Sequence, residues 1–184
     1  MSTNRTNFET KILAEIIVFA ALSAVLYIIR PFSLPYGGSI TLGSMVPVMW
    51  LSLRRGMRIG FIAGAVFGLL ALLIDVMLLP YSPITNPVQV IIEYPIAFGM
   101  LGLAGLFHKS SAAFSIIGVS ISGLVKFFLH FIAGIIFWAY TVPEGWNPAT
   151  WSAVYNGSFL LPEFIISAVL MYILVKKGTL RYAL

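Results

Sequence analysis

Long apolar runs separated by short polar segments dominate this chain. Five of the runs contain few charged residues: residues 12–29, 59–79, 88–107, 112–138 and 157–175. Each is near or above the roughly 18–20 residues that an α-helix needs to cross a bilayer. A sixth run, residues 41–53, is short for a full crossing, so we expect it to be tilted, shielded by its neighbours or re-entrant. The pattern predicts an all-α integral membrane protein, a bundle of six transmembrane helices.

Composition supports this class. Hydrophobic residues make up 60% of the chain and charged residues 9%, whereas an ordinary soluble domain has about 25% charged residues. The length of 184 residues predicts a single transmembrane domain, residues 1–184, without a separate soluble module. The chain contains no cysteine, which excludes disulfides and thiolate chemistry. The net charge of +5 does not indicate nucleic-acid binding, because the basic residues lie in short loops between apolar runs.

The basic residues predict the orientation in the membrane. Six crossings place both termini on one side, and nearly all basic residues fall on that side: Arg5, Lys11, Arg54, Arg55, Arg58, Lys109, Lys176, Lys177 and Arg181. Arg30 falls on the opposite side and Lys126 lies within a run. The positive-inside rule therefore predicts cytoplasmic termini. Five crossings would scatter the same charges over both sides.

Small residues recur at helical spacing in two runs. If the short run is counted as the second, the third run contains glycines four residues apart: Gly56, Gly60, Gly64 and Gly68. The fourth run has a similar series of closely spaced glycines: Gly99, Gly102 and Gly105. This pattern is typical of helices that pack closely in lipid.

Glu93 is the residue that points most directly to function. It lies inside the apolar run 88–107, and a carboxylate in the bilayer core costs several kcal/mol unless it has a partner. Candidate partners lie in the run 112–138, where Lys126, His130 and Trp138 occur. An acid, an imidazole and an indole in one bundle indicate a pocket for a polar, cationic small molecule.

Depth along the helices brings polar groups together in the outer half of the bundle. His130 lies eight residues inward of Trp138, or about 12 Å. Glu93, Asn156 and Asp75 also fall near the outer ends of their runs, whereas the cytoplasmic half is apolar and rich in glycine. This arrangement predicts a substrate cavity that opens outward.

The residues Ser122, Lys126, His130, Gly134 and Trp138 are spaced by four and drift about 40° around a helix at each step. We therefore expect His130, Gly134 and Trp138 to line one wall, and Lys126 and Trp138 to point in different directions. Gly134 between two flat rings leaves room for a planar ligand.

Each of these residues also has a purely structural interpretation. Glu93 can form an ion pair with Lys126, His130 can hydrogen-bond to another helix, and Trp138 can anchor the helix at the interface. Other aromatic residues on the outer side fit an interfacial belt. Glu163 is either a cavity residue or the partner of another polar group, Asp75 ends or caps its helix, and His108 is expected to be solvated.

No pattern indicates catalysis, a cofactor or a metal. The sequence contains no nucleotide-binding P-loop, no HExxH and no GxSxG. A small intramembrane enzyme would need reactive groups toward the cytoplasm, and the polar cluster faces away from it. A purely structural subunit would not explain three ionisable groups within the spans.

Several sequence blocks are similar to one known family. In order they are PYGGSITL at residues 35–42, LSLRRG at 51–56, EYPIAF at 93–98, GLAGLF at 102–107 and KFFLHFIAGIIFW at 126–138. Nearly from end to end, the chain resembles the thiamine-specific substrate-binding (S) component of energy-coupling factor (ECF) transporters, the ThiT family. This resemblance implies six helices, an outward-facing site and a location in the prokaryotic plasma membrane.

The resemblance also implies binding residues, matched by motif: Glu93, Tyr94, Lys126, His130, Gly134, Trp138 and Asn156. Glu93 corresponds to the family's thiamine-binding glutamate. Trp151 stands where the family has the tyrosine of a Tyr-x-x-x-x-Asn pattern, which removes a hydroxyl, although Tyr155 is close in sequence. Tyr36 is the candidate for an aromatic residue in the first outer loop.

The implied partners are thiamine, a transmembrane scaffold subunit and a pair of ATPases that supply the hydrolysis this chain lacks. The family docks its scaffold through an Ala-x-x-x-Ala motif in the first helix. Here Ile17 and Ala21 occupy that spacing, while Ala20 and Ala24 repeat it. The expected function is high-affinity thiamine binding for ATP-driven import. The alternatives are an S component for another vitamin or pyrimidine precursor, or a small intramembrane enzyme.

Overall fold

The computed structural model describes residues 2–80, 82–108 and 110–180, with side chains from residue 9 onward. Lys109 and Arg181 lie outside the described residues. The main helices are α1 (Ser2–Ile28), α2 (Val46–Arg55), α3 (Met57–Leu78), α6 (Ala112–Phe137) and α7 (Pro148–Lys176). Between α3 and α6 the chain forms α4 (Pro87–Ile91), π-helix η2 (Ile92–Ile96), α5 (Ala97–Gly99) and 3-10 helix η3 (Met100–Phe107).

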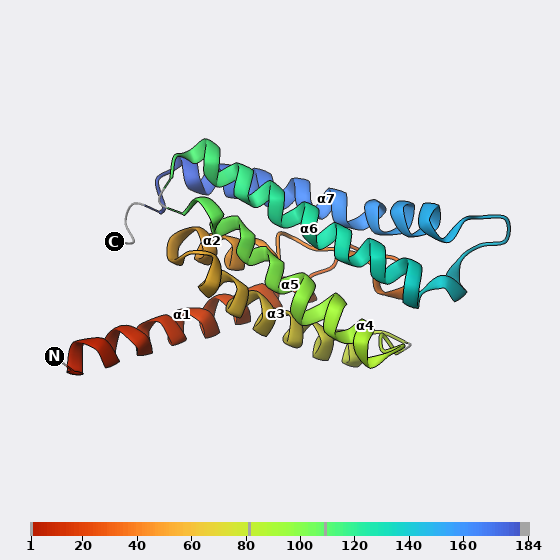
Figure 1. The fold of residues 1–184 in the computed structure, drawn as a ribbon, viewed down its shortest axis with the longest axis horizontal. Coiled ribbons are helices and arrows are strands. Elements are labelled where there is room, and N and C mark those ends of the chain that lie inside the picture. The colour runs from red at the N-terminus through yellow and green to blue at the C-terminus, as the bar shows by residue number, and fades with distance from the viewer. Residues whose placement is uncertain (1, 81, 109, 181–184) are drawn as a thin grey trace.

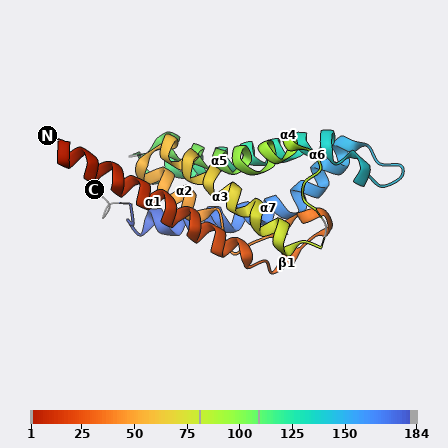
Figure 2. The ribbon, with the colours of Figure 1, turned by 90° about the horizontal axis from the view of Figure 1, so that it is seen from below.

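The helices run roughly along one axis in an elongated bundle (Figure 1). The start of α1 and the end of α7 lie at the same end, and α4 lies toward the other (Figures 1 and 2). α6 packs on both α7 and η3, while α3 packs on α1, α2 and η3. Among the described residues, five segments are long and apolar enough to cross a membrane, with α4 to η3 counted as one, residues 87–107. The predicted all-α membrane bundle is therefore confirmed.

The short second crossing is only partly helical. The predicted run began at Thr41, but α2 begins at Val46, and the chain before it forms strand β1 (Phe32–Ser33), 3-10 helix η1 (Pro35–Gly37) and strand β2 (Ser39–Ile40). Gly43 has a φ of +78°, a left-handed conformation that interrupts a helix. Most of α2 is buried by its neighbours, as in the shielded arrangement that the sequence left open.

The fourth crossing is irregular where Glu93 lies. Pro95 has no backbone N–H to donate and its ring disturbs the preceding helical turn, and here the chain widens into a π-turn over η2. It then tightens into the 3-10 helix η3. Such π-turns are frequent at functional sites because they redirect neighbouring side chains. Here the π-turn contains both Glu93 and Tyr94.

Close backbone contact explains the glycine pattern. A Cβ on Gly64 would lie 2.3 Å from the Phe98 carbonyl oxygen, and one on Gly68 would lie 2.4 Å from the Tyr94 carbonyl oxygen. α3 therefore packs directly against η2 and α5, which holds the π-turn in place. Gly56 differs from the prediction, since it separates α2 from α3 with a φ of +91°.

The alanines of α1 divide between two faces. Ala20 is fully buried and Ala24 is 8% exposed, both in the protein's own core. Ala14 and Ala21 are exposed. Ala21 is therefore the accessible one of the three alanines expected at the docking face, and the docking role of Ala20, Ala21 and Ala24 stays a prediction.

Candidate functional site

A cavity lies between α3, η2, α6, α7 and the segment that contains η1. All nine residues proposed from the sequence as substrate contacts line it: Tyr36, Glu93, Tyr94, Lys126, His130, Gly134, Trp138, Trp151 and Asn156. The structure adds lining residues that the sequence did not single out as binding residues, including Tyr27, Asp75, Phe98, Ser152, Tyr155 and Glu163.

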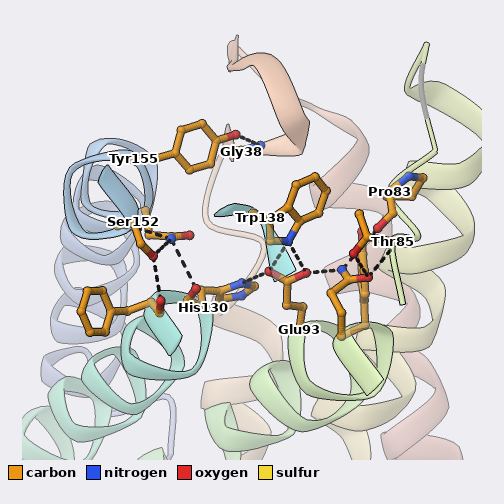
Figure 3. Close-up of polar contacts among 12 residues, drawn as sticks. Gly38, Pro83, Thr85, Glu93, His130, Trp138, Ser152 and Tyr155 are labelled. Atoms are coloured by element: carbon orange, nitrogen blue, oxygen red, sulfur yellow. Dashed lines mark hydrogen bonds and ion pairs between the residues drawn. The ribbon is translucent and has the colours of Figure 1, made fainter. Parts of the chain in front are cut away.

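The Glu93 carboxylate is held from three directions. Trp138 Nε1 donates to both carboxylate oxygens, at 3.2 and 3.1 Å, and Gln89 Nε2 donates to Oε2. His130 Nδ1 lies 3.7 Å from Oε1. Figure 3 shows the carboxylate between the indole of Trp138 and the imidazole of His130. Groups from two crossings therefore fix an acceptor on the cavity wall.

Gln89 orients Glu93 and is itself fixed. It is fully buried one helical turn before Glu93, and its Nε2 also donates to the Pro83 carbonyl at 3.3 Å. Its Oε1 accepts from the backbone N and the hydroxyl of Thr85, at 3.2 and 3.3 Å. The loop before α4 thus sets the Gln89 amide so that it donates toward Glu93. The signal for Gln89 in the sequence was that it is a polar residue four positions before Glu93 in the same apolar run.

His130 keeps free hydrogen-bonding capacity. Its Nε2 is buried and has no hydrogen-bond partner among the described residues. Its Nδ1 lies 3.7 Å from Glu93 Oε1, beyond hydrogen-bond distance, so within the described ranges this side chain forms no helix-to-helix hydrogen bond.

Lys126 and Trp138 both line the cavity, contrary to the divergence that helical spacing predicts. The reason is that α6 ends at Phe137, and Trp138 leaves the helix with φ −112° and ψ 15°. Its ring turns back over the cavity and stacks on Tyr140 with ring centroids 5.9 Å apart.

Asn156 and Ser152 join α7 to α6 beside the cavity. Ser152 Oγ donates to the Phe131 carbonyl at 2.7 Å, and Asn156 Nδ2 donates to the His130 carbonyl at 3.3 Å. A Cβ on Gly134 would lie 2.2 Å from Ser152 Oγ, so glycine allows this approach. Asn156 Oδ1 accepts no hydrogen bond from the part of the chain that the structure describes.

Aromatic residues surround the mouth of the cavity. Trp151 Nε1 donates to Thr141 Oγ1 at 3.2 Å, and Tyr36 is 43% exposed with a positive φ of 65°. The hydroxyl of Tyr155 donates to the Pro35 carbonyl and accepts from Gly38 N at 3.0 Å (Figure 3). Tyr155 therefore ties α7 to the η1 segment.

Asp75 belongs to a buried network, not to a helix cap. It is 3% exposed within α3, and its carboxylate pairs with Arg30 Nη2 at 2.5 Å. The hydroxyls of Tyr27 and Tyr94 donate to its other oxygen at 3.0 and 2.9 Å. The network fixes Tyr94 on the cavity wall beside Glu93. Sequence reasoning missed it because Arg30 and Asp75 are 45 residues apart.

Lys126 does not pair with Glu93, so this alternative from the sequence is wrong. Its Nζ lies 3.6 Å from the centroid of the Phe98 ring. Glu163, whose role was open, lines the cavity and also receives hydrogen bonds from Thr41 and Ser44. His108 is exposed, as expected.

The described residues contain no group of three or more His, Cys, Asp or Glu side chains that could hold a metal ion. The cavity instead combines the Glu93 carboxylate with the imidazole of His130 and the indole of Trp138 under an aromatic mouth. This combination suits a flat cation that carries hydrogen-bonding groups.

Known proteins that resemble the chain agree with this chemistry. The sequence profile of the family described as "Thiamine transporter protein (Thia_YuaJ)" matches residues 13–182. A protein named thiamine transporter ThiT from Lacticaseibacillus paracasei is 32% identical, over 89% of this chain and 86% of its own length. A Bacillus subtilis protein of the same name is 30% identical, over 88% of each chain.

A solved structure, ThiT from Listeria monocytogenes, has a similar fold. The two superpose with a TM-score of 0.79 and 29% sequence identity, over 94% of this chain and 97% of the other.

Proposed function

The chain belongs to the thiamine transporter family, and we propose that it is the thiamine-capturing subunit of an ATP-driven ECF-type importer. It is a multi-pass bacterial membrane protein with a transport role, not a catalytic one. The proposed binding residues are those on the cavity wall: Glu93, Tyr94, Lys126, His130, Gly134, Trp138, Asn156, Trp151 and Tyr36.

The observation that carries this proposal is the fixed carboxylate of Glu93. Thiamine joins a positively charged thiazolium ring to an aminopyrimidine. Glu93 is 12% exposed, and its charge can pair with the thiazolium, accept from the amino group, or do both. The faces of His130 and Trp138 can stack on flat rings. Binding requires no covalent step.

Intrinsic fluorescence tests whether the ligand occupies this cavity. Of the four tryptophans, Trp138 and Trp151 line it, whereas Trp50 stacks on Phe19 elsewhere. We expect thiamine to quench the wild-type emission, and Trp138→Phe and Trp151→Phe each to reduce the quench. Trp50→Phe serves as the control and should keep it. An unchanged quench in the Trp138→Phe/Trp151→Phe double variant would move the site elsewhere.

The cavity is proposed to open to the outside of the cell. The start of α1 and the ends of α2 and α7 lie at the end of the bundle away from α4 (Figure 1). The last turn of α2 carries Arg54 and Arg55. The positive-inside rule places this end in the cytoplasm.

Cysteine labelling checks the orientation without background, because the chain has no cysteine. Arg58, in the first turn of α3, and Glu144, in the loop before α7, are both exposed. The start of α3 and the loop before α7 lie at opposite ends of the bundle (Figure 1). We expect Arg58→Cys to react with a membrane-impermeant maleimide only after the cells are opened, and Glu144→Cys to react in intact cells. The reverse pattern would invert the protein and place the cavity on the cytoplasmic side.

A further inference from the structure

Asp75 is a carboxylate on the cavity wall that the proposed binding residues do not include. It is 3% exposed within α3 and lines the cavity beside Tyr27 and Tyr94. A buried charge of this kind costs several kcal/mol unless it is paired and hydrogen-bonded. Its partners come from two other parts of the chain: Tyr27 and Arg30 at the outer end of α1, and Tyr94 in the π-turn. Asp75 therefore joins α1 and the π-turn on one wall.

Arg30 keeps Asp75 ionised. Its Nη2 lies 2.5 Å from Asp75 Oδ1, and the two side chains are 8% and 4% exposed. The guanidinium is itself fixed, because its Nε donates to the Tyr27 carbonyl at 3.0 Å and its central carbon lies 4.3 Å from the centroid of the Tyr27 ring. A guanidinium does not lose its proton in a protein, so the carboxylate that it pairs with carries a charge. This ion pair gives a reason for an arginine on the side of the bundle that has few basic residues.

The ionised carboxylate fixes the direction of two tyrosine hydroxyls. The hydroxyls of Tyr27 and Tyr94 lie 3.0 and 2.9 Å from Asp75 Oδ2. An ionised carboxylate can only accept hydrogen bonds, and a phenol has a single hydrogen to donate. Both hydrogens must therefore point at Asp75. Toward a ligand, each phenol oxygen can only accept.

Tyr94 cannot easily escape this arrangement. Its side chain is 7% exposed, and its ring stacks on Phe98 with the two planes 3° apart. The backbone of Tyr94 is also held, since its carbonyl oxygen lies against Gly68 of α3. Tyr27, Asp75 and Tyr94 thus form a rigid wall whose side chains offer a ligand acceptors and no free hydrogen.

The other charges that line the cavity add to this preference. Glu93 and Glu163 are further carboxylates among the described lining residues, and Lys126 is the cationic one. Arg30 is already paired with Asp75 and is not among the residues that line the cavity in the described part of the chain. An anion would therefore meet like charges in a medium of low dielectric constant. A neutral or cationic group with a hydrogen to donate would meet acceptors.

We propose that Asp75 is a specificity-determining residue, which makes its wall accept ligand groups that donate hydrogen bonds and reject phosphate esters of the vitamin. Asp75 acts through its charge and through the hydroxyls of Tyr27 and Tyr94. This inference rests on the proposed thiamine function. Thiamine is a cation whose hydroxyl and amino groups can both donate. A phosphate ester replaces the hydroxyl hydrogen with a group that has a charge of about −1.5 to −2 near pH 7.

A ratio of two affinities tests this role. Calorimetry gives the dissociation constants of thiamine and of thiamine monophosphate for the purified wild type in detergent and for Asp75→Asn. We expect the wild type to bind the monophosphate at least about tenfold more weakly than thiamine. In Asp75→Asn this ratio should fall about tenfold, the lower end of the range for a hydrogen bond to a charged group.

The ratio separates specificity from a structural role. A distorted cavity would weaken both ligands alike, because they share the same rings, and would leave the ratio unchanged. An unchanged ratio in folded Asp75→Asn would overturn the proposal, and so would a wild type that binds both ligands equally well. Glu144→Gln removes an exposed carboxylate outside the cavity and is the matched control, which should keep the wild-type ratio.

Replacing the whole ion pair provides a second route if Asp75→Asn does not fold. The Arg30→Met/Asp75→Leu double variant leaves no buried charge unpaired, and replacements of this kind are often neutral or stabilising. The hydroxyls of Tyr27 and Tyr94 then lose their acceptor and can donate toward the cavity, so the ratio should fall here too, and an unchanged ratio would again count against the proposal. A wild type that binds no thiamine would refute the proposed function. A wild type that binds thiamine, with a ratio that does not depend on Asp75, would refute only this inference.

Discussion

Replacing Glu93 with glutamine is expected to weaken thiamine binding by at least about a hundredfold while the protein stays folded. The glutamine amide keeps the shape of the side chain and can still accept a hydrogen bond from Trp138 or Gln89. The substitution removes a desolvated negative charge that faces a cationic ligand. Losing one partner of such a pair costs several kcal/mol, and each 1.4 kcal/mol is about tenfold in affinity. Calorimetric titration of the purified variant in detergent measures the change.

Glu144→Gln is the control for this result. Glu144 is an exposed carboxylate in the loop between α6 and α7 and does not line the cavity, so its neutralisation should leave the affinity unchanged. Thiamine affinity close to wild type in a folded Glu93→Gln protein would remove Glu93 from the site.

Substituting tryptophan for Ala21 should abolish uptake by the reconstituted transporter and leave thiamine binding intact. Ala21 is exposed on α1, away from the cavity. Association of helices in lipid depends on small residues that let the backbones approach each other, so a bulky ring at the proposed docking face should keep the scaffold subunit away. Uptake of labelled thiamine into proteoliposomes with the scaffold and ATPases gives the readout.

A tryptophan on another exposed helix face controls for size. Leu124 on α6 is 65% exposed, and Leu124→Trp is expected to support normal uptake. ATP-dependent uptake by Ala21→Trp at the wild-type rate would exclude this face of α1 from docking. Concentrative uptake by the wild-type chain alone, without ATPases or ATP, would refute its role as a capture subunit.

Hydropathy predicted the long helices because each exposes a broad apolar surface to lipid. Leu13, Leu73 and Phe128, on three different helices, are all more than half exposed. The same pattern failed between residues 41 and 45, because Thr41 and Ser44 use their hydroxyls on Glu163 and Gly43 turns the chain. These contacts join segments about 120 residues apart, which local periodicity does not detect.

The sequence predicted those contacts in the candidate site that depend only on how deep each residue lies along its helix. Glu93 and His130 meet because both lie in the half of adjacent crossings that is farther from the start of α1. The orientation of Trp138 was not predictable, since it depends on where α6 ends. The burial of Ala20 and Ala24 also escaped prediction, because an alanine face can pack inward or outward with equal local preference.

Titration of the purified wild-type protein with thiamine, followed by calorimetry in detergent without other subunits, tests the central claim most directly. The cavity is formed by this chain alone, so we predict saturable binding of about one thiamine per protein without ATP. Absence of binding up to millimolar thiamine, by a protein that remains folded and monodisperse, would contradict the claim that this chain captures the vitamin.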